Sequence, residues 1–398
     1  PFGRLLGAFG TLFYWAIGLL GTTPPSTYSA KKAKELEPNL ITGRKAVKYF
    51  DAQLPDNDSR FVYDFIRHAK SRGADVRNYT ELTSASFDGV WELGITAVKK
   101  KSTVKAKSVV NAAGPYAQNV SQLLGSKTKA GLVFSKGIHL VLNRKLTENY
   151  QVLAFWDEEG RLFYVLPMGD RSMIGTTDTR VEKPETKTNK DDIDFVLRQI
   201  NAQLELAQPI TKDQIVSDRS GVRPLVVENG DSGDNQDWHA LSRKHAIEAN
   251  RDKQVVTILG GKLTDCLNVG EEVIDELKGF GMQLEDPGTW FGEGSQERKT
   301  EFFAKVASQT TGNEDLIATG LWRRHGNKAF DIIGEQKLED IFDGLGITAQ
   351  EISYIAESED VVTREDLLRR RLPVMMARGE KEIASNKKLQ KLLVELGL

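Results

Sequence analysis

The sequence predicts a mixed α/β (α+β) fold with an all-helical domain at its C-terminal end. Alternating β-type segments occupy residues 74–179, and two β-branched strands run into glycine turns at residues 109–114 and 254–261. The β-type pattern disappears after Thr300. We therefore expect one domain over residues 1–290 and a helical domain over residues 291–398, joined through the polar segment 285–296.

Composition excludes several classes of protein. The chain has 398 residues, 39% of them hydrophobic and 28% charged, which is the balance of a globular protein with a large core. The formal charge is −2, so the whole molecule has no electrostatic bias toward nucleic acid. Cys266 is the only cysteine, which excludes a disulfide framework and a cysteine-based zinc site and fits a reducing compartment. We expect no metal site.

The N-terminal run Leu5 to Leu20 carries no charged residue and is shorter than the ~20 residues of a spanning helix. Its larger side chains fall on one helical face, so we expect a helix with an exposed apolar face, which rests on a membrane surface or on a protein neighbour. The residues of that face are Leu5, Phe9, Leu12, Phe13, Ala16 and Leu20. The first residue is proline, which suggests a piece of a longer protein.

Further elements follow from periodicity and turn residues. A β-meander is expected over residues 74–114, and a hairpin turn at Gly169-Asp170. Residues 218–227 and 254–259 are predicted strands. Thr363 and Asp366 form a capping signature ahead of a helical segment. Amphipathic helices are expected at residues 31–36, 59–71 and 190–206.

Two glycine turns indicate a nucleotide site. The strand before Ala113-Gly114 ends where a glycine would permit close approach of a ligand. The turn at Gly260-Gly261 leads into a helix, whose free N–H groups attract negative charge. A Walker A loop is excluded, because Val256 stands where its first glycine is needed and Leu263 follows Lys262.

Several polar residues lie on or beside otherwise apolar strands. Any one of them could form an ordinary ion pair, but several cations on successive strands suggest a pocket for a small anion. These residues are Lys136, His139, Thr176, Thr177, Arg223, Arg243 and Lys262.

The order and spacing of these motifs resemble the FAD-dependent glycerol-3-phosphate dehydrogenases. The resemblance rests on VNAAGPYAQNV, SKGIHLVL, FYVLPMGDRSMIGTTDT, SGVRPLV, SRKHAIE and GGKLT, and it extends to YFDAQLPDNDSRF and to EDVVTREDLLRRR. It implies a partial FAD-binding Rossmann-like domain with an inserted antiparallel substrate sheet, followed by the helical domain. The implied reaction is oxidation of sn-glycerol 3-phosphate to dihydroxyacetone phosphate, with electrons passed to membrane quinone or to oxygen. The implied location is the cytoplasm, at the inner face of the membrane. The oligomeric state stays open, with a homodimer among the alternatives.

The resemblance also implies site residues. Arg223, Arg243, Lys262 and Thr177 would face the substrate. His139 would be the base that takes the C2 hydroxyl proton, with Arg223 beside it, although a histidine hydrogen-bonded within a strand is the alternative. The flavin would be lined by Ala113, Gly114, Gly260, Gly261, Lys262, Leu263 and Thr264.

Two departures from the family pattern matter. No strand here is followed by the G-x-G-x-x-G turn that holds the FAD pyrophosphate in the family. We therefore expect residues 1–398 alone to bind less than one FAD per chain. The family's Thr-Thr-Tyr-Arg is replaced by Thr264-Asp265-Cys266-Leu267. Two alternatives therefore remain: a related flavin enzyme acting on a 2-hydroxy acid or amino acid, and a cofactor-free inactive fragment.

Overall fold

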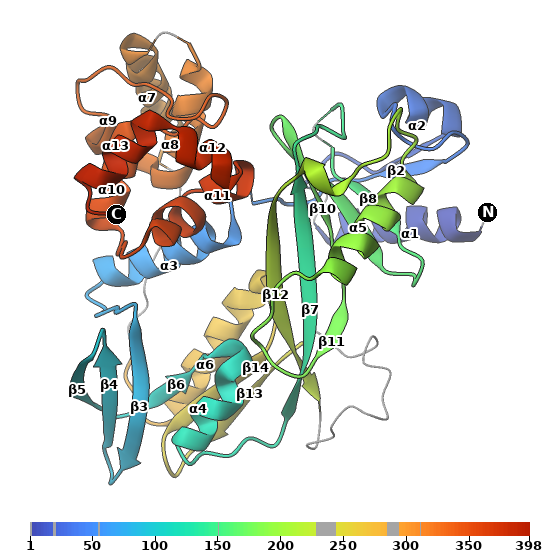
Figure 1. Cartoon of the computed structure of the whole chain (residues 1–398). Coiled ribbons are helices and arrows are strands. Elements are labelled where there is room, and N and C mark those ends of the chain that lie inside the picture. The colour runs from blue at the N-terminus through green and yellow to red at the C-terminus, as the bar shows by residue number, and fades with distance from the viewer. Residues whose placement is uncertain are drawn as a thin grey trace.

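The computed structural model describes residues 2–18, 21–54, 56–149, 151–227, 244–284, 294–310 and 312–398. Its β-rich part and its C-terminal helices lie at different ends of the molecule (Figure 1). The helices of the first part are α1 (Phe2–Ile17), α2 (Ala30–Leu36), α3 (Asp58–Ser71), α4 (Ala117–Leu123), α5 (Lys190–Gln203) and α6 (Cys266–Gly279). The predicted helices at residues 31–36, 59–71 and 190–206 correspond to α2, α3 and α5.

The largest sheet is built around β7 (Gly131–Leu142). Along its whole length β7 pairs antiparallel with β12 (Ile215–Val227). Its other edge is shared by β10 (Arg171–Gly175) and β11 (Thr179–Val181). β9 (Leu162–Met168) and β8 (Leu153–Trp156) complete the sheet beyond β10. The predicted turn at Gly169-Asp170 joins β9 and β10, as the register Arg171 to Met168 confirms.

One face of this sheet forms the main core. Alternate residues of β7, namely Ile138, Leu140 and Leu142, are fully buried against Val196 and Ile200 of α5. A strand with a period of two buries every second side chain, and each such aliphatic side chain contributes about 1.5–3 kcal/mol. The opposite face of β7 is consequently available for polar residues.

The described residues form three smaller sheets besides the large one. β6 (Val109–Asn111) runs parallel to β14 (Val255–Gly260), which pairs antiparallel with β13 (His245–Asn250). The expected meander is β3 (Thr80–Phe87), β4 (Trp91–Ala97) and β5 (Lys100–Ala106). β1 (Ser26–Tyr28) pairs with β2 (Ala46–Lys48). The 3-10 turn η1 (Gly114–Tyr116) follows β6, and η5 (Leu263–Asp265) precedes α6.

The described C-terminal residues are helical. Thr363 and Asp366 cap one another as predicted, because each backbone N–H donates to the other side chain. The segment that follows is a π-helix rather than an α-helix. The elements are α7 (Gln296–Gln309), α8 (Glu314–His325), α9 (Ala329–Ile333), α10 (Ala349–Ser358), η7 (Asp366–Arg371), α11 (Val374–Ala377), α12 (Glu380–Ser385) and α13 (Lys387–Glu395). The expected domain boundary falls within residues 285–293, outside the described part of the chain.

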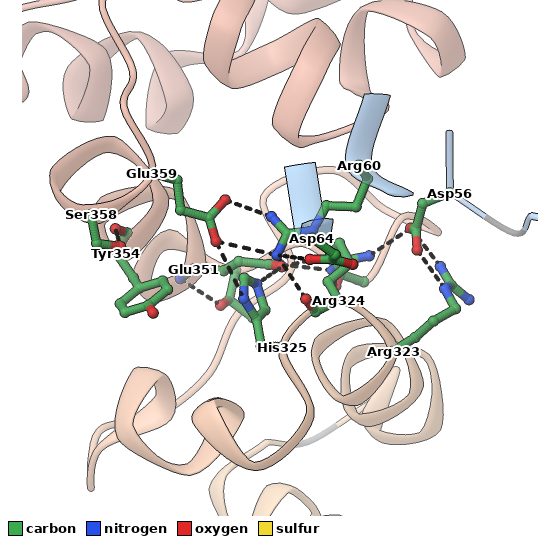
Figure 2. A network of polar contacts seen from close by, with 12 residues as sticks. Asp56, Arg60, Asp64, Arg323, Arg324, His325, Glu351, Tyr354, Ser358 and Glu359 are labelled. Carbon is green, nitrogen blue, oxygen red and sulfur yellow. Dashed lines mark hydrogen bonds and ion pairs between the residues drawn. The ribbon is translucent and has the colours of Figure 1, made fainter. Parts of the chain in front are cut away.

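Helix α3 packs against these C-terminal helices through a buried ion-pair network (Figure 2). Arg60 of α3 donates to Glu359 at 2.5 Å and to the carbonyl of Arg324 at 2.7 Å. Arg324 in turn pairs with Glu351 at 2.6 Å, and His325 lies 2.8 Å from the same carboxylate. An early helix of the chain is therefore bound by charge to the C-terminal part.

Helix α1 has the expected exposed apolar face. Phe9, Phe13 and Ile17 are 70%, 68% and 64% exposed, while Trp15 donates to the carbonyl of Thr22 and Tyr14 donates to Asp51. Leu19 and Leu20 of the predicted run lie outside the described residues. Within the described part of the chain, every helix is too short or too polar to cross a membrane.

Candidate active site

The polar face of the large sheet brings together residues from β7 and β12. The register pairs His139 with Arg219, Gly137 with Gly221, and Ser135 with Arg223. Residues that pair in this way point to the same side of a sheet, so His139 and both arginines share one face. α5 covers the opposite face of the sheet (Figure 1).

Three glycines of this face leave room around those side chains, and we call Gly137, Gly175 and Gly221 the glycine floor. A Cβ at Gly137 would lie 2.3 Å from the Arg223 guanidinium, and one at Gly175 would lie 2.8 Å from the His139 ring. A Cβ at Gly221 would meet nothing within 4 Å. Arg223 and His139 therefore lie over glycines, and the space above Gly221 is open to a ligand.

Arg223 is held in place by the segment after β10. Its Nη2 donates to the Thr176 hydroxyl at 3.1 Å, and its Nη1 lies 3.7 Å from the Asp178 carboxylate. Ser135, directly opposite on β7, donates to the same carboxylate. The guanidinium is thus oriented yet partly exposed, which is the state expected of an anion-binding arginine.

His139 lies in an electropositive environment. Burial, which is the largest cause, acts together with the charges of Arg219 and Arg223 and lowers the pKa of the His139 imidazole to about 4, although Asp58 raises it. The imidazole is consequently neutral at pH 7 and has a lone pair that can accept a proton. A bound anion would offset the two arginines and raise this pKa toward the range of a general base.

The sequence reasoning missed Arg219. Among the described residues Asp58 is its hydrogen-bond partner, at 3.2 Å. The spacing between Arg219 and Arg223 places both on one face, because residues four apart on a strand point to the same side.

The two predicted glycine turns meet at a second edge, beside this face. β6 and β14 are parallel and in register from Val109 and Val255, so their carboxyl ends lie together. Gly114, Gly260 and Gly261 all have positive φ, at 56°, 66° and 95°. A Cβ at Gly260 would lie 2.6 Å from Val226 and 3.4 Å from the Pro224 carbonyl. The Gly260 turn is therefore adjacent to the part of β12 that carries Arg223.

This second edge suits the flavin end of FAD. Glycines without side chains permit close approach of a planar ring. The helical segment after the Gly260-Gly261 turn begins with η5, whose first N–H groups have no preceding helical turn to which they can donate. Lys262, Leu263 and Thr264 are exposed there, and Ala113 precedes η1. Among the described residues, no strand is followed by a G-x-G-x-x-G turn that would hold the pyrophosphate.

His245 supports the same turn from β13. Its Nδ1 lies 2.6 Å from Asp265 and its Nε2 lies 3.0 Å from Glu272. Gly261 lies against it, because a Cβ at Gly261 would be 3.2 Å from that of His245. Asp265, which departs from the family pattern, thus has a structural partner in this chain.

The remaining predicted residues have different positions. Lys136 is on the opposite face, in a buried ion pair with Asp192 at 2.6 Å, so its inclusion among the anion-site cations is wrong. The Thr177 hydroxyl is buried and accepts a hydrogen bond from the Ile138 backbone at 3.1 Å. Arg243 lies outside the described residues.

A cavity of about 430 Å³ lies elsewhere, between α3 and η7. Asp58 forms part of its wall, together with apolar side chains such as Val62 and Ile66. Neither His139 nor Arg223 lines the cavity, but Asp58 also pairs with Arg219, so the cavity adjoins the Arg219 end of the polar face.

The fold and this site define a class of flavin enzyme. The family model described as FAD dependent oxidoreductase matches residues 14–242, more than half of the chain. The chain belongs to this family, whose cofactor is FAD.

Among curated proteins the chain is similar to aerobic glycerol-3-phosphate dehydrogenases. It is 30% identical to that of Bacillus subtilis (strain 168) over 287 residues, which is 70% of this chain and 50% of the relative. It is 29% identical to that of Staphylococcus aureus (strain MRSA252) over 284 residues, which is 69% of this chain and 50% of the relative. The chain thus spans about half the length of these relatives.

A solved structure agrees with the fold. Glycerol-3-phosphate dehydrogenase from Bacillus halodurans, solved as a complex with FAD, matches with a TM-score of 0.72 and 23% sequence identity. The match covers 93% of this chain and 75% of that chain. The predicted mixed α/β fold with a helical C-terminal part is therefore confirmed.

Proposed function

We propose that the protein takes part in the FAD-dependent oxidation of sn-glycerol 3-phosphate to dihydroxyacetone phosphate. The observation that carries this proposal is the placement of Arg223, which lies over Gly137 on the face that also bears His139, beside the Gly260 turn. A forked guanidinium in a partly buried site suits a phosphate group. The names of the similar curated relatives support the same substrate.

The residues have distinct roles in this proposal. Arg223 binds the substrate phosphate, with Lys262 at the Gly260 turn, Arg243 and Thr177 contributing to the same pocket. His139 accepts the C2 hydroxyl proton as the C2–O bond becomes a carbonyl. Ala113, Gly114 and the turn from Gly260 to Thr264 hold the flavin end of the cofactor. FAD, when bound, supplies the hydride acceptor.

The wider setting belongs to the same proposal. Electrons pass on to membrane quinone or to oxygen, and the protein associates with the cytoplasmic face of the membrane. The exposed Phe9, Phe13 and Ile17 of α1 supply an apolar surface that suits the membrane interface. Residues 1–290 form the oxidoreductase domain and residues 291–398 form the helical domain.

A substrate panel tests the proposal. Flavin-loaded protein is mixed without oxygen with glycerol 3-phosphate, glycerol, lactate, 2-hydroxyglutarate or glycine, and loss of the visible flavin absorbance is followed. We expect rapid loss with glycerol 3-phosphate. Faster loss with a hydroxy acid or amino acid would instead support a related oxidase.

A further inference from the structure

Arg219 is the charged residue of the polar face that the proposed mechanism has not used. It pairs in register with His139, one strand away, and is separated from Arg223 by the open position above Gly221. Its side chain is about one-third exposed. A ligand on the glycine floor would therefore lie between two arginines, with His139 beside one of them.

The orientation of Arg219 depends on the helical part of the protein. Asp58, at the first turn of α3, lies 3.2 Å from its Nη2, and α3 is in turn fixed by Arg60 to Glu359. The strand itself is also held, because Ser217 donates to the Met376 carbonyl at 2.9 Å. An arginine whose side chain is already paired, on a strand that is itself held, loses less conformational entropy when it binds an anion than a free surface arginine does.

We propose that Arg219, held by Asp58, is a substrate-positioning residue that binds the anionic end of the substrate on the His139 side of the glycine floor, opposite Arg223. This inference rests on the proposed function and adds a further cation to its phosphate site. The inference also places the Arg219–Asp58 pair in one wall of the active site. Because Asp58 belongs to α3, and α3 is bound to the C-terminal helices, these helices support that wall.

The same geometry affects His139. Among the described residues, the charges that shift its pKa are Arg219 and Arg223 of β12 and Asp58 of α3, while Gly175 of β10 lies against the ring. Substrate phosphate bound to Arg219 would reduce the net positive charge there and make His139 a stronger base only while substrate is present.

The test compares Arg219→Gln and Asp58→Asn with the wild type, all loaded with flavin. The control is Arg198→Gln, which removes an exposed arginine of α5, paired with Glu158. Binding of inorganic phosphate is measured by calorimetry, and kcat and KM are measured with glycerol 3-phosphate and with uncharged glycerol. We expect Arg219→Gln to weaken phosphate binding and raise KM for glycerol 3-phosphate at least about tenfold, with kcat/KM for glycerol unchanged.

Asp58→Asn should give a smaller change of the same kind, because the charge of Arg219 remains and only its orientation is lost. The acid limb of kcat/KM should move to higher pH in Arg219→Gln, since removal of a cation raises the pKa of His139. The control should match the wild type in every measurement.

Unchanged phosphate affinity in Arg219→Gln, with weakened affinity in Arg223→Ala, would overturn this inference and leave the proposed function intact. Failure of the wild type to oxidise glycerol 3-phosphate, with oxidation of another compound in the panel, would overturn the proposed function itself. Equal loss of glycerol and glycerol 3-phosphate turnover in Arg219→Gln would show a general structural role, which also contradicts the inference.

Discussion

The guanidinium of Arg223 lies across the backbone of Gly137, in the space that a β-carbon at residue 137 would fill. That carbon would be 2.3 Å from Nη2 and 2.4 Å from Nη1. The charge of Arg223 is therefore positioned by the absence of a side chain on the neighbouring strand.

Gly137→Ala should displace Arg223 and raise KM for glycerol 3-phosphate by about tenfold or more, because a charge-assisted phosphate contact is lost. Overpacking should also cost about 1–3 kcal/mol of unfolding free energy. Steady-state kinetics and denaturant unfolding measure the two effects. Gly221→Ala is the matched control for stability, since its Cβ meets nothing within 4 Å. Unaltered kinetics in Gly137→Ala would contradict the role of Arg223.

In protein loaded with flavin, Arg223→Ala should raise KM for glycerol 3-phosphate while the flavin content stays at the wild-type level. The physical reason is that the guanidinium faces the glycine floor, whereas the flavin is expected at the Gly114 and Gly260 turns. Kinetics and the ratio of flavin to protein check both parts. Normal KM, or loss of flavin, would show that Arg223 has been assigned to the wrong ligand.

Arg60→Ala should destabilise the protein by about 3–5 kcal/mol, because it leaves the buried Glu359 without its nearest charged partner. Urea unfolding gives the free energy. Lys32→Ala is the control, since the Lys32–Glu35 pair is exposed and such pairs contribute about 0–1 kcal/mol. A loss below 1 kcal/mol in Arg60→Ala would mean that the network of Figure 2 contributes little to stability.

Glu351 should make stability fall in acid. Although burial raises its pKa, Arg324 and His325 outweigh burial and lower the pKa to about 2, from 4.5. A carboxylate with a depressed folded pKa stabilises the protein above its unfolded pKa, and this contribution is lost as pH falls toward the folded pKa. The gap in unfolding free energy between wild type and Glu351→Gln should therefore narrow from about pH 4.5 toward pH 2. A difference in unfolding free energy that does not change with pH would contradict the lowered pKa of Glu351.

His245 should have the opposite pH dependence. Burial lowers its pKa, but the hydrogen bonds to Glu272 and Asp265 outweigh burial and the pKa is raised above 6.5. The contribution of His245 to the free energy of unfolding is fully present below pH 6.5 and is lost as pH rises through its raised folded-state pKa. NMR titration should show this raised pKa, and Asp265→Asn should lower it. An unchanged titration in Asp265→Asn would contradict the pairing.

The apolar face of α1 should bind membranes without crossing them. Replacing both Phe9 and Phe13 with serine should abolish flotation with lipid vesicles and leave the melting temperature unchanged, because both side chains are exposed. Val394→Ser is the control, since Val394 is an exposed apolar residue of α13, in the C-terminal helices far from α1 (Figure 1). Flotation of the double variant would contradict the assignment of α1 as the surface that binds the membrane.

The local sequence pattern already indicates which residues of β7 share a face. The alternation in β7 already separates Ser135, Gly137 and His139 from Lys136, because a strand turns successive side chains to opposite faces. By the same alternation, Lys136 faces α5, away from the anion site. Arg219 could have been found in the same way from its spacing to Arg223.

The sequence by itself determined the helices α2, α3 and α5, the β3 to β5 meander, the glycine turns at Gly114 and Gly260, and the exposed face of α1. These features depend on short-range properties: side-chain periodicity, turn geometry and the conformational freedom of glycine. Only the tertiary structure decided that His139 lies opposite Arg219, that Gly260 abuts β12, and that α3 is bound to the C-terminal helices. Strand register and helix docking between residues 80 to 300 positions apart are set by packing and by buried charge, and neither is visible in the local sequence.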